Sequence, residues 1–201
     1  MHKIKEILVG TNNIGKYKEI CDLLPKKLIK NSPKKFNIFT PEETGKTFEE
    51  NSMLKASYFS KKTNLICLSD DSGLEIDLLG GRPGIYSARW SGPNNDFNLA
   101  IKRVFYEMTK AKKNWLNDNA AKFICCLTLY FPEGKYYTSR GEVEGKISKI
   151  KKGTKGFGYD PIFIPKGYNK TFGEMNPKKK LLIDHRYNSF LKLKNFFINI
   201  L

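Results

Sequence analysis

Short apolar runs separated by helical patterns constrain the fold of this chain more than any other feature. The runs IKEILV (residues 4–9) and LICLS (residues 65–69) have the length and composition of strands. Helical periodicity lies between them, over about residues 11–24 and from Thr47 to about Lys62. Strands that alternate with helices are typical of α/β proteins, in which neighbouring strands run parallel.

The second half of the chain adds longer strands. Residues 121–147 read as two long strands around the turn PEGK, which predicts an antiparallel pair. Helices are predicted over residues 96–112 and from about Asp184, and a short strand is predicted at FNIFT, residues 36–40. The combination predicts an α/β fold with a mixed central sheet and flanking helices, in a single domain over residues 1–201.

Composition excludes several classes of protein. Apolar residues make up 40% of the chain and aromatic residues 13%, which is too many for a disordered chain. No apolar run approaches the roughly 20 residues that span a bilayer, and the N-terminus lacks the apolar stretch of a signal peptide. We therefore expect a cytoplasmic protein with no membrane partner. The cysteines form no CxxC pair, so we expect reduced thiols and no structural zinc site.

The net charge of +16 leaves the partner open. So basic a chain suits a nucleic-acid surface or a strongly anionic small substrate, and many solvated lysines alone would also produce it. The sequence contains no RNA- or DNA-binding motif with interleaved aromatic residues, so we expect no specific nucleic-acid binding. Charge alone does not decide between the remaining interpretations.

The turn GTNNIGK after the first predicted strand is a candidate anion site. Free N–H groups and the helix dipole at the start of a helix favour an anion, and Lys16 adds a positive charge. The turn is not a Walker A loop, because Tyr17 stands where that loop needs Ser or Thr. Taken alone, such a stretch is more often an ordinary turn with an exposed lysine.

Two adjacent acids, Asp70 and Asp71, follow the predicted strand at residues 65–69. Carboxylates at a strand end suit Mg²⁺, which prefers oxygen ligands and often shares them with phosphates. If the chain stays extended, the two side chains point to opposite sides and only one reaches a metal directly. The alternative is an Asx-type turn in which Asp71 or Ser72 caps backbone groups, and this stretch alone supports both equally.

Three further stretches contain candidate binding residues. Asn51 and Lys55 share one face of the helix from Thr47, so Lys55 is either solvated or a phosphate ligand. In GFGYDPIF the glycines let the backbone approach a ligand, and Phe157 offers a ring for stacking or for the core. In DHR two cations stand in the first turn of a helix, where the helix dipole disfavours them, which indicates another purpose.

These stretches, in this order, resemble the inosine triphosphate pyrophosphatase family. The matching segments are TNNIGK, PEETGKTFEENSMLKA, DDSGLEIDLLGGRPGIYSARWSG, GFGYDPIF and DHR, and they extend from residue 11 to residue 186. The resemblance implies a mixed α/β sheet with two lobes around a nucleotide-binding cleft, and a homodimer. It also implies Mg²⁺-dependent hydrolysis of non-standard purine nucleoside triphosphates (ITP, dITP and XTP) to the monophosphate and pyrophosphate.

The resemblance further implies a role for each matching residue. Asp71 is expected to accept a proton from water and, with Glu42, to bind Mg²⁺, while Asp70 orients water or the backbone. The residues expected to bind the substrate are Thr11, Asn12, Asn13, Gly15, Lys16, Lys55, Ser72, Phe157, Gly158, Tyr159, Asp160, Lys180, His185 and Arg186. Within this set, the loop residues 11–16 and Lys55 are expected at the phosphates, and Ser72 is expected to contact the substrate. The residues from Phe157 onward are expected at the base and sugar.

Two positions depart from the family pattern. Asn12 replaces a common glycine, and asparagine tolerates positive φ well enough for the loop to survive. Asp184 replaces a common serine and can still cap the last helix.

Two rival functions remain. The first is a related pyrophosphatase that prefers modified pyrimidines; His185 and Arg186 disfavour it, because their donors predict a preference for 6-oxo over 6-amino purines. The second is a basic nucleic-acid-binding module that has lost catalysis. It is disfavoured by the intact Lys16, Glu42, Lys55 and Asp71.

Overall fold

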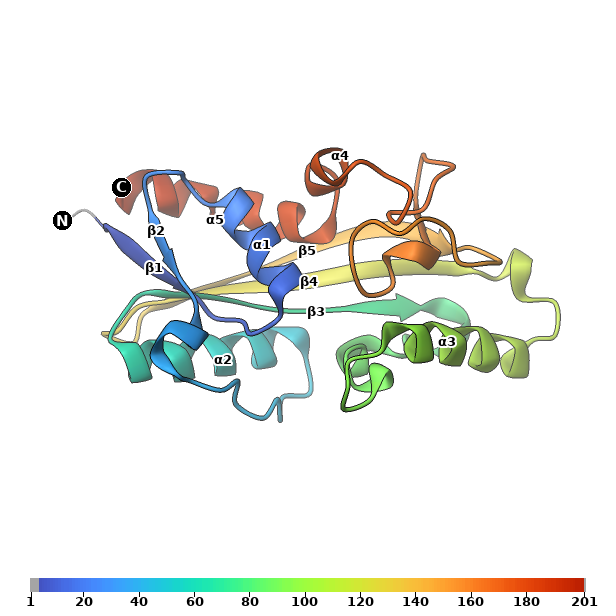
Figure 1. Ribbon diagram of the computed structural model, residues 1–201, viewed down its shortest axis with the longest axis horizontal. Helices are drawn as coiled ribbons and strands as arrows, with labels where there is room; N and C mark the ends of the chain where they lie inside the picture. The colour runs from blue at the N-terminus through green and yellow to red at the C-terminus, as the bar shows by residue number, and fades with distance from the viewer. Residues whose placement is uncertain (1–3, 201) are drawn as a thin grey trace. The chain divides into compact units, whose positions relative to one another are not determined.

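The computed structural model describes residues 4–200 and contains one six-stranded sheet (Figure 1). Its strands, paired in the order β2-β1-β3-β4-β5-β6, are β1 (Glu6–Val9), β2 (Ile29–Asn31), β3 (Cys67–Ile76), β4 (Ala120–Tyr130), β5 (Tyr136–Ile147) and β6 (Phe163–Pro165). The α-helices are α1 (Ile14–Leu23), α2 (Phe48–Thr63), α3 (Phe97–Ala111), α4 (Pro177–Leu181) and α5 (His185–Ile200). Both β2 and β3 run parallel to β1, and β6 runs antiparallel to β5, so the predicted α/β fold with a mixed sheet is confirmed.

The short strand predicted at residues 36–40 is wrong. FNIFT forms no strand: Phe36 ends a 3-10 helix, η1 (Pro33–Phe36), and Asn37 has a φ of 54°. The strand β2 lies instead in the basic stretch before it and pairs with β1. With only three residues, it is too short to show a period of two in the sequence.

Local sequence explains where α2 begins and ends. Thr47 Oγ1 accepts the N–H of Glu50 (3.1 Å), and Glu50 Oε2 reaches back to the N–H of Lys46 (2.6 Å). Asn64 ends the helix in the left-handed conformation with a φ of 55°. The predicted start of this helix at Thr47 is confirmed.

The chain divides into two compact units. Unit 1 comprises the residues up to Asp71, Cys125–Gly141 and the segment from Arg186 onward. Unit 2 comprises Ser72–Ile124 and Glu142–His185. The buried clusters of the protein follow this division, so each unit has a core of its own.

Helices cover both faces of the sheet in unit 1. Ile20 of α1 and Phe197 of α5 belong to one buried cluster with Ile7 of β1. Phe59 of α2 packs in another cluster with Leu8, the next residue of β1. Because successive strand residues face opposite sides, α1 and α2 lie on opposite faces, as Figure 1 shows.

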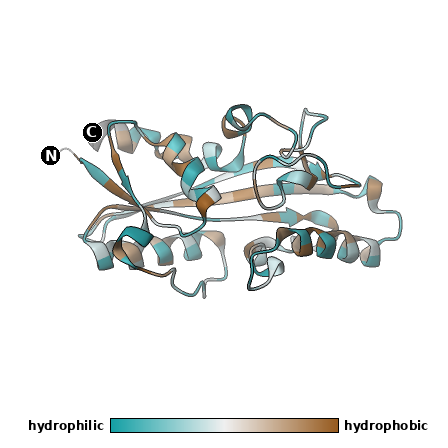
Figure 2. Cartoon of the chain, viewed as in Figure 1, coloured by the Kyte–Doolittle hydropathy of each residue, from teal (hydrophilic) through white to brown (hydrophobic). Residues whose placement is uncertain are grey.

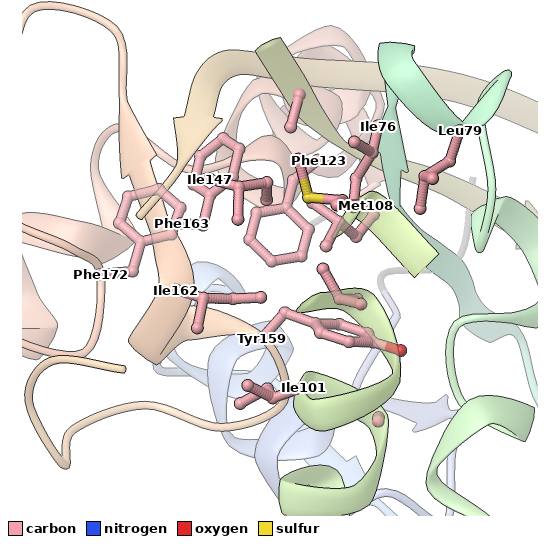
Figure 3. Packing of buried hydrophobic residues seen from close by; sticks show 14 of the residues in the cluster. Ile76, Leu79, Ile101, Met108, Phe123, Ile147, Tyr159, Ile162, Phe163 and Phe172 are labelled. Carbon is pink, nitrogen blue, oxygen red and sulfur yellow. The ribbon is translucent and has the colours of Figure 1, made fainter. Parts of the chain in front are cut away.

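Aromatic rings fill the core of unit 2 (Figure 3). The ring of Phe123 on β4 lies 4.6 Å from that of Phe163 on β6, centre to centre, and Phe172 packs beside them. Ile101 of α3 closes this core from the helix side. The buried residues Ile101, Val104 and Met108 recur every three or four positions along α3, as expected for a helix with one buried face, and Figure 2 shows both apolar and polar residues along this helix.

Cys21, Cys67, Cys125 and Cys126 are free thiols, and the last three are buried. Within residues 4–200, no helix is long and apolar enough to cross a membrane.

Candidate active site

The candidate anion loop connects β1 to α1 in unit 1. Thr11 Oγ1 accepts the N–H of Asn13 (3.2 Å), and Asn13 Oδ1 caps α1 by accepting the N–H of Lys16 (3.0 Å). At the base of the loop, a Cβ atom added to Gly10 would lie only 2.6 Å from Cys67 Sγ. Close packing therefore fixes one end of the loop, and a helix cap fixes the other.

The strand β3 continues through Asp70 and Asp71 without a turn, so the Asx-type turn is wrong. In an extended strand the two carboxylates point to opposite sides, as predicted for this geometry. Asp70 Oδ2 lies 3.2 Å from Lys16 Nζ. Asp71 Oδ1 lies 3.2 Å from Lys55 Nζ, and its Oδ2 accepts an N–H of Asn51 (3.3 Å). Each acid thus pairs with a different lysine, and the predicted shared face of Asn51 and Lys55 is confirmed.

Lys55 is deeply buried between two carboxylates. Its side chain contacts Asp71 and also Glu43, a residue that the sequence did not single out. Burial alone would lower the pKa of Lys55, but Asp71 and Glu43 hold that pKa above its ordinary value, so the ammonium stays charged. The neighbouring Glu42, predicted as a metal ligand, has an exposed side chain. Its role stays a prediction, and Glu43 is the acid that the structure adds.

The contacts of Arg186 explain why this cation lies at the start of α5, where the helix dipole disfavours it. It is fully buried, and its Nη1 donates to Glu19 Oε2 (2.5 Å) while its Nη2 donates to Asp70 Oδ2 (3.0 Å). These two carboxylates compensate the positive charge that the helix dipole disfavours. Sequence reasoning missed Glu19; the one available signal was its position three residues after Lys16, on the same face of α1.

The two adjacent acids have opposite pKa shifts. Burial would raise the pKa of Asp70, but Lys16 and Arg186 hold that pKa well below its ordinary value. Burial also raises the pKa of Asp71, and the attraction of Lys55 only partly offsets it. A carboxylate with a raised pKa accepts a proton more readily, which favours Asp71 over Asp70 as a general base.

The structure also fits a shared Mg²⁺. Because Asp71 and Glu43 contact the same ammonium of Lys55, their carboxylates lie close together. Protein sites often hold Mg²⁺ through one or two carboxylates and the phosphate oxygens of the substrate. In the described part of the chain, no three His, Cys, Asp or Glu side chains group so as to hold a metal. The donor set suits a Mg²⁺ that arrives with a phosphate ligand.

A second polar cluster lies in unit 2 around Asp160. Its Oδ2 accepts hydrogen bonds from the N–H of Phe157 (2.9 Å) and from Lys180 Nζ (2.7 Å). The Lys180 ammonium also lies 5.0 Å from the centre of the Phe157 ring. Gly156 has a φ of 73°, and a Cβ there would lie 2.0 Å from Asp160 Oδ2, so glycine is required. The ion pair fixes the loop that carries Phe157.

Tyr159 and His185, also predicted at the base, lie against the core of unit 2. The Tyr159 hydroxyl donates to Ser87 O (2.9 Å), and burial raises the pKa of Tyr159. The His185 ring stacks on Phe123 at 4.8 Å and 14°. Phe157 and Gly158 are half-buried, so Phe157 is the ring of this loop with surface left for stacking.

Asn12 contributes to the anion loop through its side chain, which the sequence did not suggest. Apart from glycines, positive φ occurs in the described chain at Asn37, Asn64 and Asn95, so the expected use of positive φ at Asn12 is wrong. Asn12 Nδ2 instead donates to Thr40 Oγ1 (2.9 Å).

Two further predicted substrate contacts lie next to charged residues of the site, Gly15 before Lys16 and Ser72 after Asp71. Gly15 lies in the first turn of α1, and Ser72 is half-buried in β3 directly after Asp71. Their roles toward a substrate stay predictions.

Fold and site together define an α/β protein in which adjacent aspartates each pair with a lysine. A family model described as the Ham1 family matches residues 7–196, and the chain belongs to this family. The resemblance seen in the sequence is therefore confirmed.

Relatives of known name match nearly the whole chain. A dITP/XTP pyrophosphatase of Oceanobacillus iheyensis is 43% identical over 201 residues, which are 98% of this chain and 100% of the relative. A dITP/XTP pyrophosphatase of Bacillus subtilis is 42% identical over 199 residues, 94% of this chain and 96% of the relative. The solved structure of a HAM1 protein from Coxiella burnetii has a TM-score of 0.87 at 32% identity, covering 98% of this chain and 100% of that one.

Proposed function

We propose that this protein hydrolyses non-standard purine nucleoside triphosphates, namely ITP, dITP and XTP, to the monophosphate and pyrophosphate. The observation that carries the proposal is the pairing of Asp70 with Lys16 and of Asp71 with Lys55, since lysines held in place are suited to phosphate. Relatives named dITP/XTP pyrophosphatase, which align over nearly the whole chain, support the same substrate class.

In this mechanism the lysines bind the phosphates and Asp71 accepts a proton. Phosphoryl transfer depends mainly on positioning and on stabilising negative charge, and Lys16 and Lys55 supply two positive charges. The water oxygen forms a bond to phosphorus, its proton passes to Asp71, and the α–β phosphoanhydride bond breaks to release pyrophosphate. Asp70, with its lowered pKa, stays ionised and holds Lys16.

Mg²⁺ is the cofactor in this proposal. Asp71 holds it together with Glu42, as the resemblance implies, or with Glu43, which contacts the same lysine as Asp71. Bound Mg²⁺ neutralises phosphate charge at the scissile bond. Removal of Mg²⁺ with EDTA should abolish turnover, and addition of Mg²⁺ should restore it.

The base and sugar are assigned to residues 157–160 with Lys180, His185 and Arg186. The half-buried Phe157 ring supplies a stacking surface, and the ion pair of Lys180 and Asp160 fixes its loop. Arg186 already donates to two carboxylates, and the N–H groups of Phe157 and Asp160 are used within the loop. The N–H groups of Gly158 and Tyr159, with His185, therefore become the main donors toward a 6-oxo group.

The test is pyrophosphate release with Mg²⁺ from ITP, dITP, XTP and ATP. We expect the first three to be used and ATP to be disfavoured by ~10⁴ in kcat/KM, because a donor-lined pocket leaves the 6-amino group unpaired. Comparable use of ATP would contradict the base assignment. No pyrophosphate from any of the four would contradict the reaction itself.

We further propose a cytoplasmic homodimer and one functional domain over residues 1–201. The strands β3, β4 and β5 each contribute residues to both units, so neither unit is a continuous piece of chain. Light scattering in solution tests the dimer, and a mass near the 23.1 kDa of one chain would contradict it.

A further inference from the structure

The segment between η1 and α2, residues 37–47, carries acids of the candidate site but has no helix or strand of its own. Side-chain contacts therefore decide where it lies. Near its end the N–H of Gly45 donates to Asn51 Oδ1 (2.8 Å), and in its middle Glu43 contacts Lys55. An irregular segment keeps one position only when such contacts offset the loss of conformational entropy.

Asn12 supplies a contact near the start of this segment. Its Nδ2 donates to Thr40 Oγ1 (2.9 Å) and to Ile38 O (3.4 Å). The neighbouring Thr11 and Asn13 use their side-chain oxygens for bonds within the anion loop and the first turn of α1. Of these three side chains, that of Asn12 is the one that reaches another segment.

With this contact, a ring of interactions in unit 1 joins the two predicted phosphate-binding cations. Its charged members, each in contact with or adjacent to the next, are Lys16, Asp70, Asp71, Lys55 and Glu43. Glu43 belongs to segment 37–47, and Asn12 ties that segment back to the loop that carries Lys16.

We propose that Asn12 and Thr40 are positioning residues that fix the spacing between Lys16 and Lys55 by tying segment 37–47 to the anion loop. The inference rests on the proposed function, in which one triphosphate meets both lysines. Groups that are ordered before the ligand arrives lose less entropy on binding. The hydrogen bond between Asn12 and Thr40 therefore acts on KM more than on kcat.

Two substitutions remove this bond from opposite sides. Asn12→Ala deletes the donor, and Thr40→Val deletes the acceptor, whereas Thr40→Ser keeps the hydroxyl. Asn94→Ala, at an exposed position of unit 2, is the matched control. With dITP we expect KM to rise roughly three- to tenfold in Asn12→Ala and Thr40→Val, as for one lost hydrogen bond, with kcat within about twofold of wild type. Thr40→Ser and the control should match wild type.

The double variant separates this role from a direct contact of Asn12 with the substrate. Because both substitutions remove the bond to Thr40, combining them should raise KM no further than Asn12→Ala alone, which also removes the longer bond to Ile38 O. A direct substrate contact of Asn12 would leave Thr40→Val without effect. Limited trypsin digestion gives a readout without activity: we expect faster cleavage after Lys46, in segment 37–47, in both single variants but not in the control.

Three kinetic outcomes would overturn the inference: unchanged KM in both single variants, additive effects in the double variant, or a fall in kcat at constant KM. A wild-type protein that releases pyrophosphate from no triphosphate would refute the proposed function instead. In that case unchanged cleavage after Lys46 would overturn the inference on Asn12, and faster cleavage would support it.

Discussion

Lys55 in unit 1 and Lys180 in unit 2 are equally buried, each 4% exposed, but their partners differ. Lys55 contacts two carboxylates, those of Asp71 and Glu43. Lys180 contacts the carboxylate of Asp160, which is itself buried.

The surroundings of these ion pairs differ as well. The side chain of Glu43 is 24% exposed, so the ion pairs of Lys55 border solvent, from which a phosphate arrives. Lys180 lies over two rings, 5.0 Å from the centre of Phe157 and 5.5 Å from that of Phe172, and its acid is 3% exposed. The comparison teaches that a buried lysine lies within reach of a ligand only where one of its partners borders solvent. We expect Lys55 to act on the substrate and Lys180 to act chiefly on the stability of unit 2.

The largest expected effect is at the acid beside Lys55. Asp71→Asn keeps the size of the side chain but removes the proton acceptor and a metal charge. We expect kcat for dITP to fall on the order of 10³-fold or more, with a melting temperature close to that of wild type. Steady-state kinetics and thermal unfolding measure both, and activity within about tenfold of wild type would sink the assignment of Asp71.

The next effect belongs to the lysine of unit 2. Lys180→Met keeps the apolar contacts with the rings but leaves the buried Asp160 without its cation. We expect the free energy of unfolding, measured with urea, to fall by about 3 kcal/mol. The paired variant with Asp160→Asn should recover part of this loss. Wild-type stability in Lys180→Met would remove the difference between the two lysines.

A smaller effect is expected at the anion loop. Lys16→Ala removes a phosphate ligand whose side chain is 16% exposed, so the fold should tolerate it. We expect kcat/KM for dITP to fall about 10- to 100-fold, while the affinity for the monophosphate product changes little. If the variant loses affinity equally for product and triphosphate, Lys16 does not bind the phosphates that are released as pyrophosphate.

The smallest effect concerns a helix cap in unit 2. Asp96 caps α3 by accepting the N–H of Asn98 (2.9 Å). Asp96→Ala should cost about 1 kcal/mol in unfolding free energy without a change in kcat/KM, and Asp96→Ser should retain the cap. If kcat/KM fell while the variant was fully folded in the assay, the cap of α3 would also act on catalysis.

Patterns that repeat along one element were predictable from the sequence. The cap at Thr47 and the four-residue spacing of Asn51 and Lys55 depend on helix geometry alone, and both side chains do contact Asp71. Extended geometry likewise predicted that Asp70 and Asp71 face opposite sides, although the sequence left open whether the strand continues.

Contacts between distant segments were not predictable. Glu19 and Arg186 are 167 positions apart, and no local spacing relates them. The choice between Glu42 and Glu43 depends on the path of an irregular segment, which side-chain contacts rather than a repeating pattern determine. The strand predicted at FNIFT was wrong because its apolar residues do not face one side of a sheet. Phe39, for example, is 85% exposed.

The division of the chain into units sets the order in which the protein can be completed as it is synthesised. Unit 2 ends at His185, so all of it precedes Arg186 and the rest of α5 along the chain. Domains fold as their residues leave the ribosome. Asp70 and Lys16 emerge early, yet the guanidinium that shares Asp70 arrives with the last helix. A stalled chain that lacks α5 therefore holds both aspartates but not their full set of partners, and translation of α5 is the step that supplies Arg186 to Asp70.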